Sequence, residues 1–135
     1  MGRESQRLGK RGEYTALGRM LDLGLDVYVP VVDVENIDFV VRNNKGRYKA
    51  IQIKTRARKK GGETFEITLP KLSHDFFVVL HIAGTENFRV LPFKVFYRYR
   101  VRSEYFKKRG KVRLLFTKKK KEVLHRYRGD FAQLK

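Results

Sequence analysis

A pair of apolar segments joined by a short polar turn constrains the fold of this chain more than any other feature. Residues 37–42 and 47–55 are apolar runs, and the intervening Asn-Asn-Lys-Gly tolerates the positive φ angles of a tight turn. The pattern predicts two adjacent strands. Because side chains alternate along a strand, Gln52 and Lys54 share one face, with Asp38 of the neighbouring strand within reach. Three polar groups are therefore expected together on an apolar hairpin.

The remaining periodicity predicts one long helix before this hairpin and further strands after it. Apolar side chains recur at helical spacing from Ser5 to Leu23, with Ser5 as the N-cap and Gly24 closing the helix in left-handed geometry. Glu13 lies inside this helix, and Gly12 is expected to let the helix approach the sheet closely. Further strands are expected at residues 25–32, 64–69, 76–83, 87–91 and 112–116, and a second helix at 118–127. We expect an α/β fold, with a central mixed sheet that includes residues 64–69 and is flanked by helices.

The segment from Phe93 to Phe106 is both aromatic and basic. Its apolar residues fit either a short helix or an edge strand. The alternation of tyrosines with Arg98, Arg100 and Arg102 favours a strand with tyrosine packed inside and arginine outside, and stacking of the tyrosines on nucleic-acid bases is the alternative. The arginines would contact phosphate on either interpretation.

The charge of the chain is large and unevenly distributed. The formal net charge is +18, and residues 89–135 hold 17 of the 32 Lys and Arg side chains but only 3 of the 14 acidic ones. Such an excess favours a polyanionic partner, and nucleic acid fits better than a membrane because no long amphipathic helical face accompanies the charge. The residues predicted to bind nucleic acid are Arg56, Arg58, Lys59, Lys60, Arg98, Arg100, Arg102, Lys107, Lys108, Arg109, Lys118, Lys119, Lys120 and Lys121.

Length and composition predict one domain spanning residues 1–135, with a strongly basic C-terminal third at 89–135. With 41% hydrophobic residues, the chain can bury a core without a disulfide or a structural metal. It has no cysteine, which excludes thiolate metal sites and a cysteine nucleophile. Its N-terminal residues lack the apolar core of a signal peptide, and no stretch approaches the ~18 apolar residues of a membrane span. We expect an intracellular, cytoplasmic protein.

The polar groups on the hairpin suit metal-assisted phosphodiester hydrolysis. This reaction needs a divalent ion with oxygen ligands, and Asp38, the Gln52 side-chain carbonyl and the backbone carbonyl of Ile53 are oxygen donors. Lys54 can orient the attacking water and stabilise the transition state. Glu13 would reach across from the helix as a further ligand or as an acceptor for a metal-bound water.

This arrangement resembles the PD-(D/E)XK nuclease superfamily, and in particular its Gln-x-Lys variant in some intron-encoded homing endonucleases. The resemblance covers Gly12 to Arg56 well and the later strands only in their general order. It implies a restriction-endonuclease-like α/β core, an Mg²⁺- or Mn²⁺-dependent endonuclease activity and DNA as the partner. The catalytic residues that it implies are Glu13, Asp38, Gln52 and Lys54. The core is also similar to that of archaeal Holliday junction resolvases, which are commonly homodimers.

Two positions depart from the superfamily pattern. Ile37 stands where the pattern has Pro, which matters little. Gln52 replaces an acidic residue, and the loss of one negative charge should weaken metal binding unless Asp33 or Glu35 supplies it. Cleavage of both DNA strands would require a dimer or sequential nicking.

Plainer interpretations exist for several of these residues. Glu13 can pair with Arg7, Lys10 or Arg19 on a solvated helix face, and Gln52 and Lys54 fit the solvent face of an ordinary strand. The three histidines form no metal-ligand pattern, and His81 is expected in the core.

Two other functions compete with the endonuclease. One is a non-catalytic nucleic-acid-binding module that retains the nuclease fold, and the other is an RNA-binding protein. A structure-specific Holliday junction resolvase is the nearest enzymatic alternative.

Overall fold

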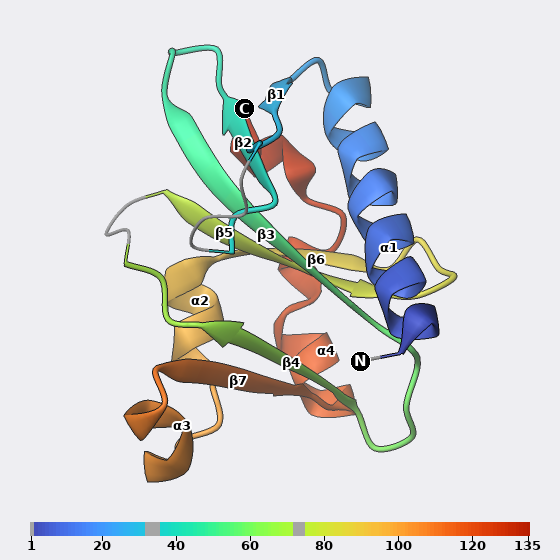
Figure 1. The fold of residues 1–135 in the computed structure, drawn as a ribbon, viewed down its shortest axis with the longest axis vertical. Coiled ribbons are helices and arrows are strands. Elements are labelled where there is room, and N and C mark those ends of the chain that lie inside the picture. The colour runs from blue at the N-terminus through green and yellow to red at the C-terminus, as the bar shows by residue number, and fades with distance from the viewer. Residues whose placement is uncertain (1, 32–35, 72–74) are drawn as a thin grey trace.

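The computed structural model describes residues 2–31, 36–71 and 75–135, and it arranges them as a mixed sheet with further elements packed on both faces (Figure 1). The elements in chain order are α1 (Arg3–Asp22), β1 (Asp26–Tyr28), β2 (Phe39–Arg42), β3 (Tyr48–Arg56), β4 (Glu63–Thr68), β5 (Phe76–Ile82), β6 (Phe88–Pro92), α2 (Phe93–Arg98), α3 (Glu104–Lys108), β7 (Lys111–Phe116), α4 (Lys118–Val123) and two 3₁₀ turns, η1 (His125–Tyr127) and η2 (Phe131–Leu134). The predicted α/β class with a central mixed sheet flanked by helices is confirmed.

The central sheet has the strand order β1-β2-β3-β5-β6. β3 and β5 run parallel, with Gln52 opposite Val78, and the other neighbours are antiparallel. The predicted turn between β2 and β3 forms around Gly46 (φ +78°), and the Asn43 side chain accepts hydrogen bonds from the backbone N–H groups of Lys45 and Arg47. This turn sets the hairpin register, which places Phe39 opposite Ile51.

Helix α1 covers one face of the sheet. Ala16 and Met20 of α1 are fully buried against a cluster that includes Ile51 and Ile53 of β3. The helix begins after Gly2, which supplies no side-chain cap, so the prediction of Ser5 as N-cap is wrong, whereas Gly24 follows the helix with the predicted positive φ (+77°). Across the described ranges, no helix combines the length and the apolar character that crossing a membrane requires.

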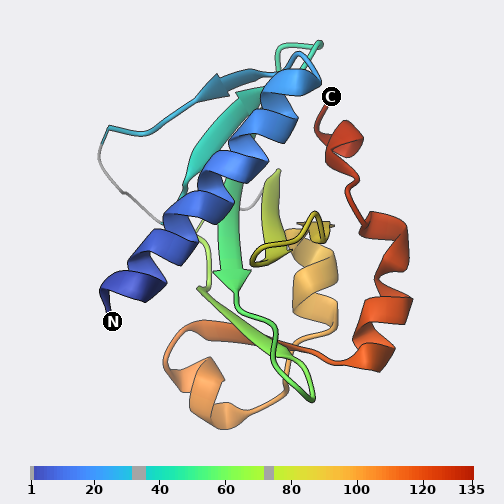
Figure 2. The same ribbon diagram turned by 90° about the vertical axis from the view of Figure 1, so that its right-hand side faces the viewer.

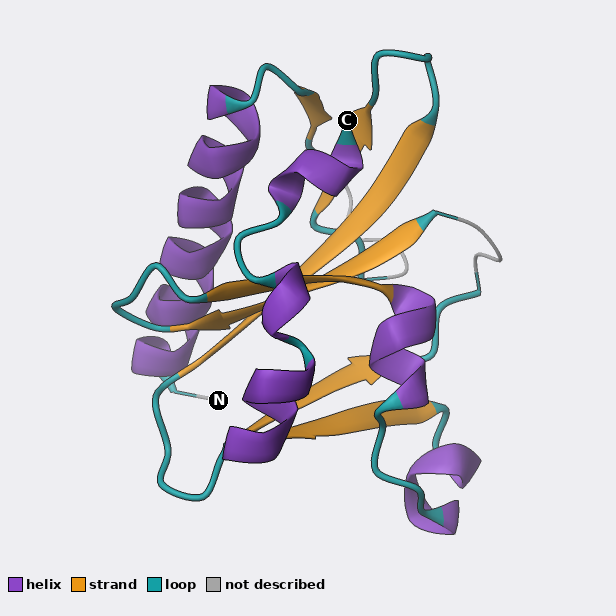
Figure 3. Ribbon diagram, turned by 180° about the vertical axis from the view of Figure 1, so that it is seen from behind, coloured by secondary structure: helices purple, strands orange, loops and turns teal. Residues whose placement is uncertain are grey.

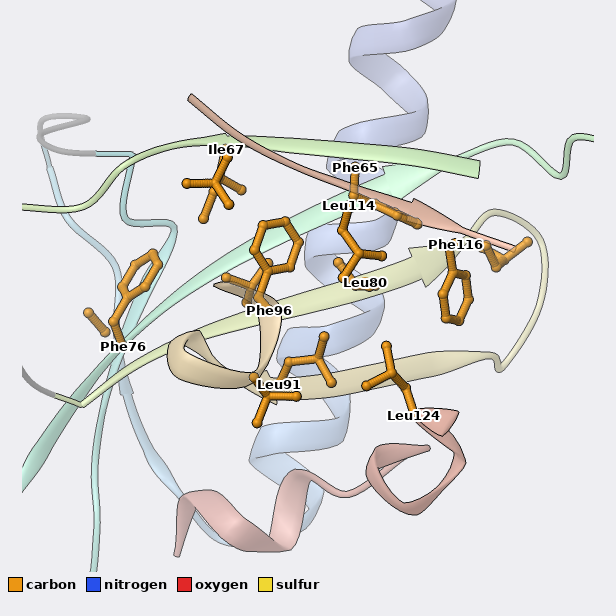
Figure 4. Close-up of a cluster of buried hydrophobic side chains, with 14 residues drawn as sticks. Phe65, Ile67, Phe76, Leu80, Leu91, Phe96, Leu114, Phe116 and Leu124 are labelled. Carbon is orange, nitrogen blue, oxygen red and sulfur yellow. The ribbon is translucent and has the colours of Figure 1, made fainter. Parts of the chain in front are cut away.

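A second, two-stranded sheet formed by β4 and β7 packs on the opposite face together with α2 (Figure 4). Phe65 and Ile67 of β4 and Leu114 of β7 join Leu80 of β5 and Phe96 of α2 in this core. The prediction that residues 64–69 belong to the central sheet is therefore wrong. Alternating burial identifies a strand and its buried face, but it does not identify the strand's partner.

Part of the C-terminal third forms helices where the sequence favours an edge strand. Residues 93–98 and 104–108 form α2 and α3, so the favoured interpretation of this segment as a strand is wrong and the helical alternative is confirmed for α2. Pro92 supplies the extended N-cap position, and Val95 and Phe96 are buried by the helical turn. The helix predicted at 118–127 is split into α4 and η1, which both lie on the rear of the molecule (Figure 3).

Candidate active site

A cleft of about 560 Å³ is lined by the N-terminal half of α1 and the C-terminal half of β3. Figure 2 shows α1 packed alongside β3. Its walls come from α1, from the residues just before β2 and from β3. The four residues predicted to be catalytic, Glu13, Asp38, Gln52 and Lys54, all line it, and so does Ile53. The fold thus brings together groups that are separated by about 40 positions in the sequence.

Asp38 lies immediately before β2 and is tied to β3 by its backbone and its side chain. Its N–H donates to Ile51 O (2.9 Å), and its Oδ2 accepts a hydrogen bond from Ile53 N–H (2.7 Å). Burial and the adjacent Glu13 carboxyl raise the pKa of Asp38 from 3.8 to about 7, although the Ile53 N–H opposes the shift. A half-buried carboxyl in this state gains most from a neighbouring cation.

Glu13 reaches the cleft from α1, and its position depends on the close packing of helix and sheet. Its side chain is 18% exposed and its Oε2 lies 3.4 Å from Lys10 Nζ. The ion pair with Lys10, which is the plainer interpretation of Glu13, therefore forms as well. The adjacent Gly12 faces the sheet, where a methyl group would overlap the Thr55 hydroxyl and lie 3.0 Å from His81 Nδ1. The prediction that Gly12 permits a close approach is confirmed.

Gln52 and Lys54 project from the face of β3 opposite Ile51 and Ile53, as the alternation predicts. Gln52 is 4% exposed, and its Oε1 is buried without a hydrogen-bond partner among the described residues. Burial lowers the pKa of the Lys54 ammonium, and the nearby positive charge of Arg56 adds to this effect. An unpaired buried carbonyl is costly, so it marks a position where an external partner would stabilise the site.

The donor set of the cleft suits a hard divalent cation. Glu13 and Asp38 supply carboxylate oxygens and Gln52 supplies an amide oxygen, which are ligand types that Mg²⁺ accepts. Within residues 2–31, 36–71 and 75–135, no group of three or more His, Asp or Glu side chains is placed to hold a metal ion. Asp33 and Glu35, which we considered as sources of the missing charge, lie outside the described residues.

The predicted nucleic-acid-binding residues fall into three groups in the structure. Arg56 lines the cleft, and Arg58, Lys59 and Lys60 follow in the exposed connection to β4. The second group lies on and around α2 and α3: Arg98, Arg100, Arg102, Lys107, Lys108 and Arg109. The third comprises Lys118, Lys119, Lys120 and Lys121 of α4.

Sequence reasoning missed two cations of the two-stranded sheet and the side chains beneath Gly12. Lys111 and Arg113 lie on β7, and Lys111 is close enough to Lys54 to lower its pKa. Buried His81 is hydrogen-bonded to Thr55 (3.3 Å) beneath Gly12. The β7 cations alternate with buried apolar residues, which is a visible signal, but the proximity of Lys111 to Lys54 depends on the pairing of β7 with β4.

Comparison with known proteins identifies the fold through structure alone. No protein-family model and no curated protein sequence matches the chain. Among solved structures, the bacterial homing endonuclease I-Ssp6803I is similar, with a TM-score of 0.68 and 21% identity over 96% of this chain and 92% of that one. A Holliday junction resolvase of the archaeal hyperthermophile Archaeoglobus fulgidus is similar with a TM-score of 0.55 and 17% identity, over 93% of each chain.

The chain has a nuclease fold. Both similarities span nearly the whole chain, including the C-terminal elements that the sequence predicted least well. The fold that the resemblance to the PD-(D/E)XK superfamily implies is therefore confirmed. Within this fold, the cleft between α1 and β3 contains the residues that the resemblance implies as catalytic.

Proposed function

We propose that this protein is a divalent-metal-dependent DNA endonuclease of the PD-(D/E)XK type, with its active site in the cleft between α1 and β3. The observation that carries the proposal is the orphaned Gln52 Oε1 in the same cleft as Glu13 and Asp38. These three side chains bring several oxygen atoms together in one cleft of a protein whose net charge is +18. A cation bound by the three side chains would relieve both the carboxyl pairing and the unsatisfied amide.

Asp38, Gln52 and Glu13 would hold Mg²⁺ or Mn²⁺, with the Ile53 carbonyl as a further oxygen donor. When bound, the metal ion supplies Lewis-acid activation of water and neutralises charge on the phosphate. The Ile53 N–H fixes the Asp38 carboxylate, so the ligand geometry is set before the ion arrives. Because Asp38 must lose its proton to bind a cation, metal affinity should rise as the pH passes through about 7.

Lys54 would act on the attacking water and on the charge of the transition state. Its side chain projects from β3 beside Gln52, and burial lowers its pKa, so that its amine gives up a proton more readily than an exposed lysine does. In its protonated form the same group donates to a phosphate oxygen, where charge develops during cleavage. Both roles require the phosphate to lie at the mouth of the cleft.

The proposed substrate is DNA, held by the basic surfaces around the cleft, and the proposed activity is cytoplasmic. One cleft per chain cuts one strand, so we propose a homodimer or sequential nicking for double-strand cleavage. The Gln at position 52 is the specific observation that favours the competing function, a non-catalytic DNA-binding module, because this residue lacks the charge of the usual acidic ligand.

Cleavage of labelled linear duplex, single-stranded and four-way-junction DNA, with Mg²⁺, Mn²⁺ or EDTA, tests the proposal. Lys54→Ala and Asp38→Ala should each lower the metal-dependent rate by about 10²- to 10³-fold. Lys45→Ala removes the same charge as Lys54→Ala from the exposed β2–β3 turn and should retain the wild-type rate. Faster cutting of the junction than of linear DNA would identify a resolvase.

Two results would contradict this function. Tight, salt-sensitive DNA binding without cutting of any substrate would establish the non-catalytic module instead. Equal losses in Lys45→Ala and Lys54→Ala would show that general charge, and not the cleft, controls the rate.

A further inference from the structure

We propose that the outer face of the β4–β7 sheet, together with α3, is the surface on which duplex DNA lies as it enters the cleft. This inference rests on the proposed function because it names the surface that presents the substrate to the same cleft. It also divides the basic residues of the chain, since it assigns DNA contact to β7 and α3 and excludes α4.

The outer face of the two-stranded sheet is mostly polar, with Leu115 as its exposed apolar side chain, and its outward residues are Thr64, Glu66, Thr68, Lys111, Arg113 and Leu115. Val112, Leu114 and Phe116 of β7 point into the core, so the alternating Lys111 and Arg113 point outward. Arg113 is opposite Glu66 of β4 and its guanidinium donates two hydrogen bonds to Glu66 Oε1 (3.1 and 2.8 Å). Lys111 Nζ donates to Thr68 Oγ1 (2.9 Å). These cross-strand bonds hold the two cationic side chains in place without burying their charge.

The outer face is continuous with the cleft. Arg56 lines the cleft, and its Nε–H donates to the backbone carbonyl of Thr64 on β4 (3.0 Å). One polar surface therefore runs from the cleft onto the β4–β7 sheet.

Helix α3 extends the same surface. Phe106 of α3 packs on the guanidinium of Arg113, with 4.4 Å from the guanidinium carbon to the ring centroid. A pocket of about 280 Å³ lies between α2, α3 and β7, and Arg100, Lys107 and Lys111 are among its lining residues. The Arg100 guanidinium is stacked on Tyr97 at 3.8 Å and donates to the Tyr97 carbonyl (2.8 Å), so its position is also fixed. Cations held in fixed positions lose less entropy when they meet a phosphate.

The tetralysine of α4 lies on the other side of the β4–β7 sheet. Leu124, which follows α4, is fully buried in the core between this sheet and β5, so α4 adjoins the inner face and not the outer one. Lys121 pairs with buried Glu63 (3.0 Å), and Lys120 lies over the Tyr99 ring. Figure 2 shows α3 on the same side as the N-terminal end of α1, with α4 on the opposite side.

The length of the surface fits a segment of duplex. The six residues of β4 span roughly 20 Å in an extended strand, which is the length of about six base pairs at ~3.4 Å per step. The surface carries two carboxylates, Glu66, which is paired with Arg113, and Glu104 at the start of α3. A rod of closely spaced phosphates is the partner whose charge and length both match.

Fluorescence-anisotropy titration of a labelled 30-base-pair duplex in EDTA tests the surface separately from catalysis. The Lys107→Gln/Lys111→Gln double variant should bind about tenfold more weakly, and the slope of log K against log salt should fall by about 2. The matched control, Lys118→Gln/Lys119→Gln, loses the same charge from exposed α4 positions and should keep the wild-type slope. Glu66→Gln should bind several-fold more tightly, because it removes a negative charge that is paired with Arg113 on this surface.

The outcomes separate this inference from the proposed function. Equal losses in the two double variants, or weaker binding by Glu66→Gln, would overturn the surface even if metal-dependent cutting is intact. The expected asymmetry without any cutting would leave the surface standing and remove the nuclease. Preference for an RNA duplex of the same sequence at equal salt would overturn the assignment to DNA.

Discussion

Two carboxyl groups withdrawn from solvent, Asp38 in the cleft and Glu63 at the start of β4, are in opposite electrostatic states. Glu63 is 1% exposed, its Oε2 accepts a hydrogen bond from Lys59 N–H (2.9 Å) and its Oε1 lies 3.0 Å from Lys121 Nζ. Burial alone would raise the pKa of Glu63, but the Lys59 N–H and the Lys121 ammonium hold it below its usual value. Asp38 has one N–H donor and a carboxyl neighbour, and its pKa is raised to about 7.

The difference shows that burial does not by itself set the charge state of a carboxyl. Glu63 has a cation of its own, so it links the connection between β3 and β4 to α4 and has no need of an external ligand. Asp38 is opposed by Glu13, and Gln52 Oε1 in the same cleft has no hydrogen-bond partner among the described residues. The first group stabilises the fold, whereas the second would be stabilised by a bound cation.

Removing the cation from Glu63 should turn it into a carboxyl that resembles Asp38, and this is the largest stability effect we predict. Lys121→Met leaves a buried charge unpaired and should lower the free energy of unfolding by about 3 kcal/mol at pH 7. A carboxyl with a lowered folded pKa stabilises above its unfolded pKa and loses this effect as the pH falls. The cost of Lys121→Met should therefore shrink towards pH 4 in urea titrations.

A double variant checks the cause. Glu63→Gln/Lys121→Met removes both charges and should recover much of the stability lost in Lys121→Met, because no charge is left unpaired. If the double variant is as unstable as the single one, the contact of the Lys121 ammonium with the Phe116 ring (5.3 Å to the centroid) is the dominant contribution, and the ion pair is not.

Moving Glu13 away from Asp38 should lower the pKa of Asp38 and so reduce the difference between Asp38 and Glu63. Gly12→Ala places a methyl group against Thr55 and His81, so α1 must shift outward at a cost of about 2 kcal/mol. The shift separates the two carboxyls, and the pKa of Asp38 should fall because one of its causes is weakened. Thermal unfolding and an NMR titration of the Asp38 carboxyl carbon measure the two effects.

The control is a second glycine of the same helix. A methyl group at Gly18 meets no other atom within 4 Å, so Gly18→Ala should stabilise the protein by roughly 0.5 to 1 kcal/mol through helix propensity. A loss of stability in Gly18→Ala equal to that in Gly12→Ala would show that the cost is not specific to the contact with Thr55.

The sequence predicts the placement of the cleft residues better than it predicts the rest of the fold, because most of these residues are close in the sequence. Asp38, Gln52 and Lys54 lie on one hairpin, and the period of two in β3 is enough to place them on a common face. The close approach at Gly12 is likewise visible from one glycine in a helical pattern. The partner of Glu63 is not predictable in this way, since Lys121 is distant in sequence and its position depends on the core between β4, β7 and β5.

The errors in the C-terminal half have the same physical origin. Alternation over residues 64–69 predicts a strand with one buried face, but the choice between the central sheet and β7 depends on contacts far along the chain. Alternating Tyr and Arg from residue 97 to 102 resembles a strand, yet burial of Val95 and Phe96 against β5 and β6 favours one helical turn there. Tertiary packing overrides local propensity at both places.

Neutralising Asp38 should have the smallest effect on stability that we predict. The effect should be stabilising, whereas leaving Glu63 without its cation should be destabilising. Asp38→Asn keeps an acceptor for the Ile53 N–H but removes the disfavoured charge, so the metal-free variant should be more stable than wild type by about 1 kcal/mol at pH 8. A carboxyl whose folded pKa is raised loses stability as the pH rises from its unfolded pKa to its folded pKa. The advantage of the variant should thus grow from pH 4 to about pH 7 and then level off.

Thermal melts of the wild type and Asp38→Asn in EDTA across this pH range measure the difference in stability. The contributions of His81 and of every other group common to the two proteins cancel in this difference. Asp22→Asn, an exposed position at the end of α1, should give a difference that is small at all pH values. Addition of Mn²⁺ should reverse the order at pH 8, since only the wild type has the carboxylate that the ion needs. An Asp38→Asn variant that is less stable than wild type at pH 8 without metal would mean that Asp38, like Glu63, already has its partner inside the fold.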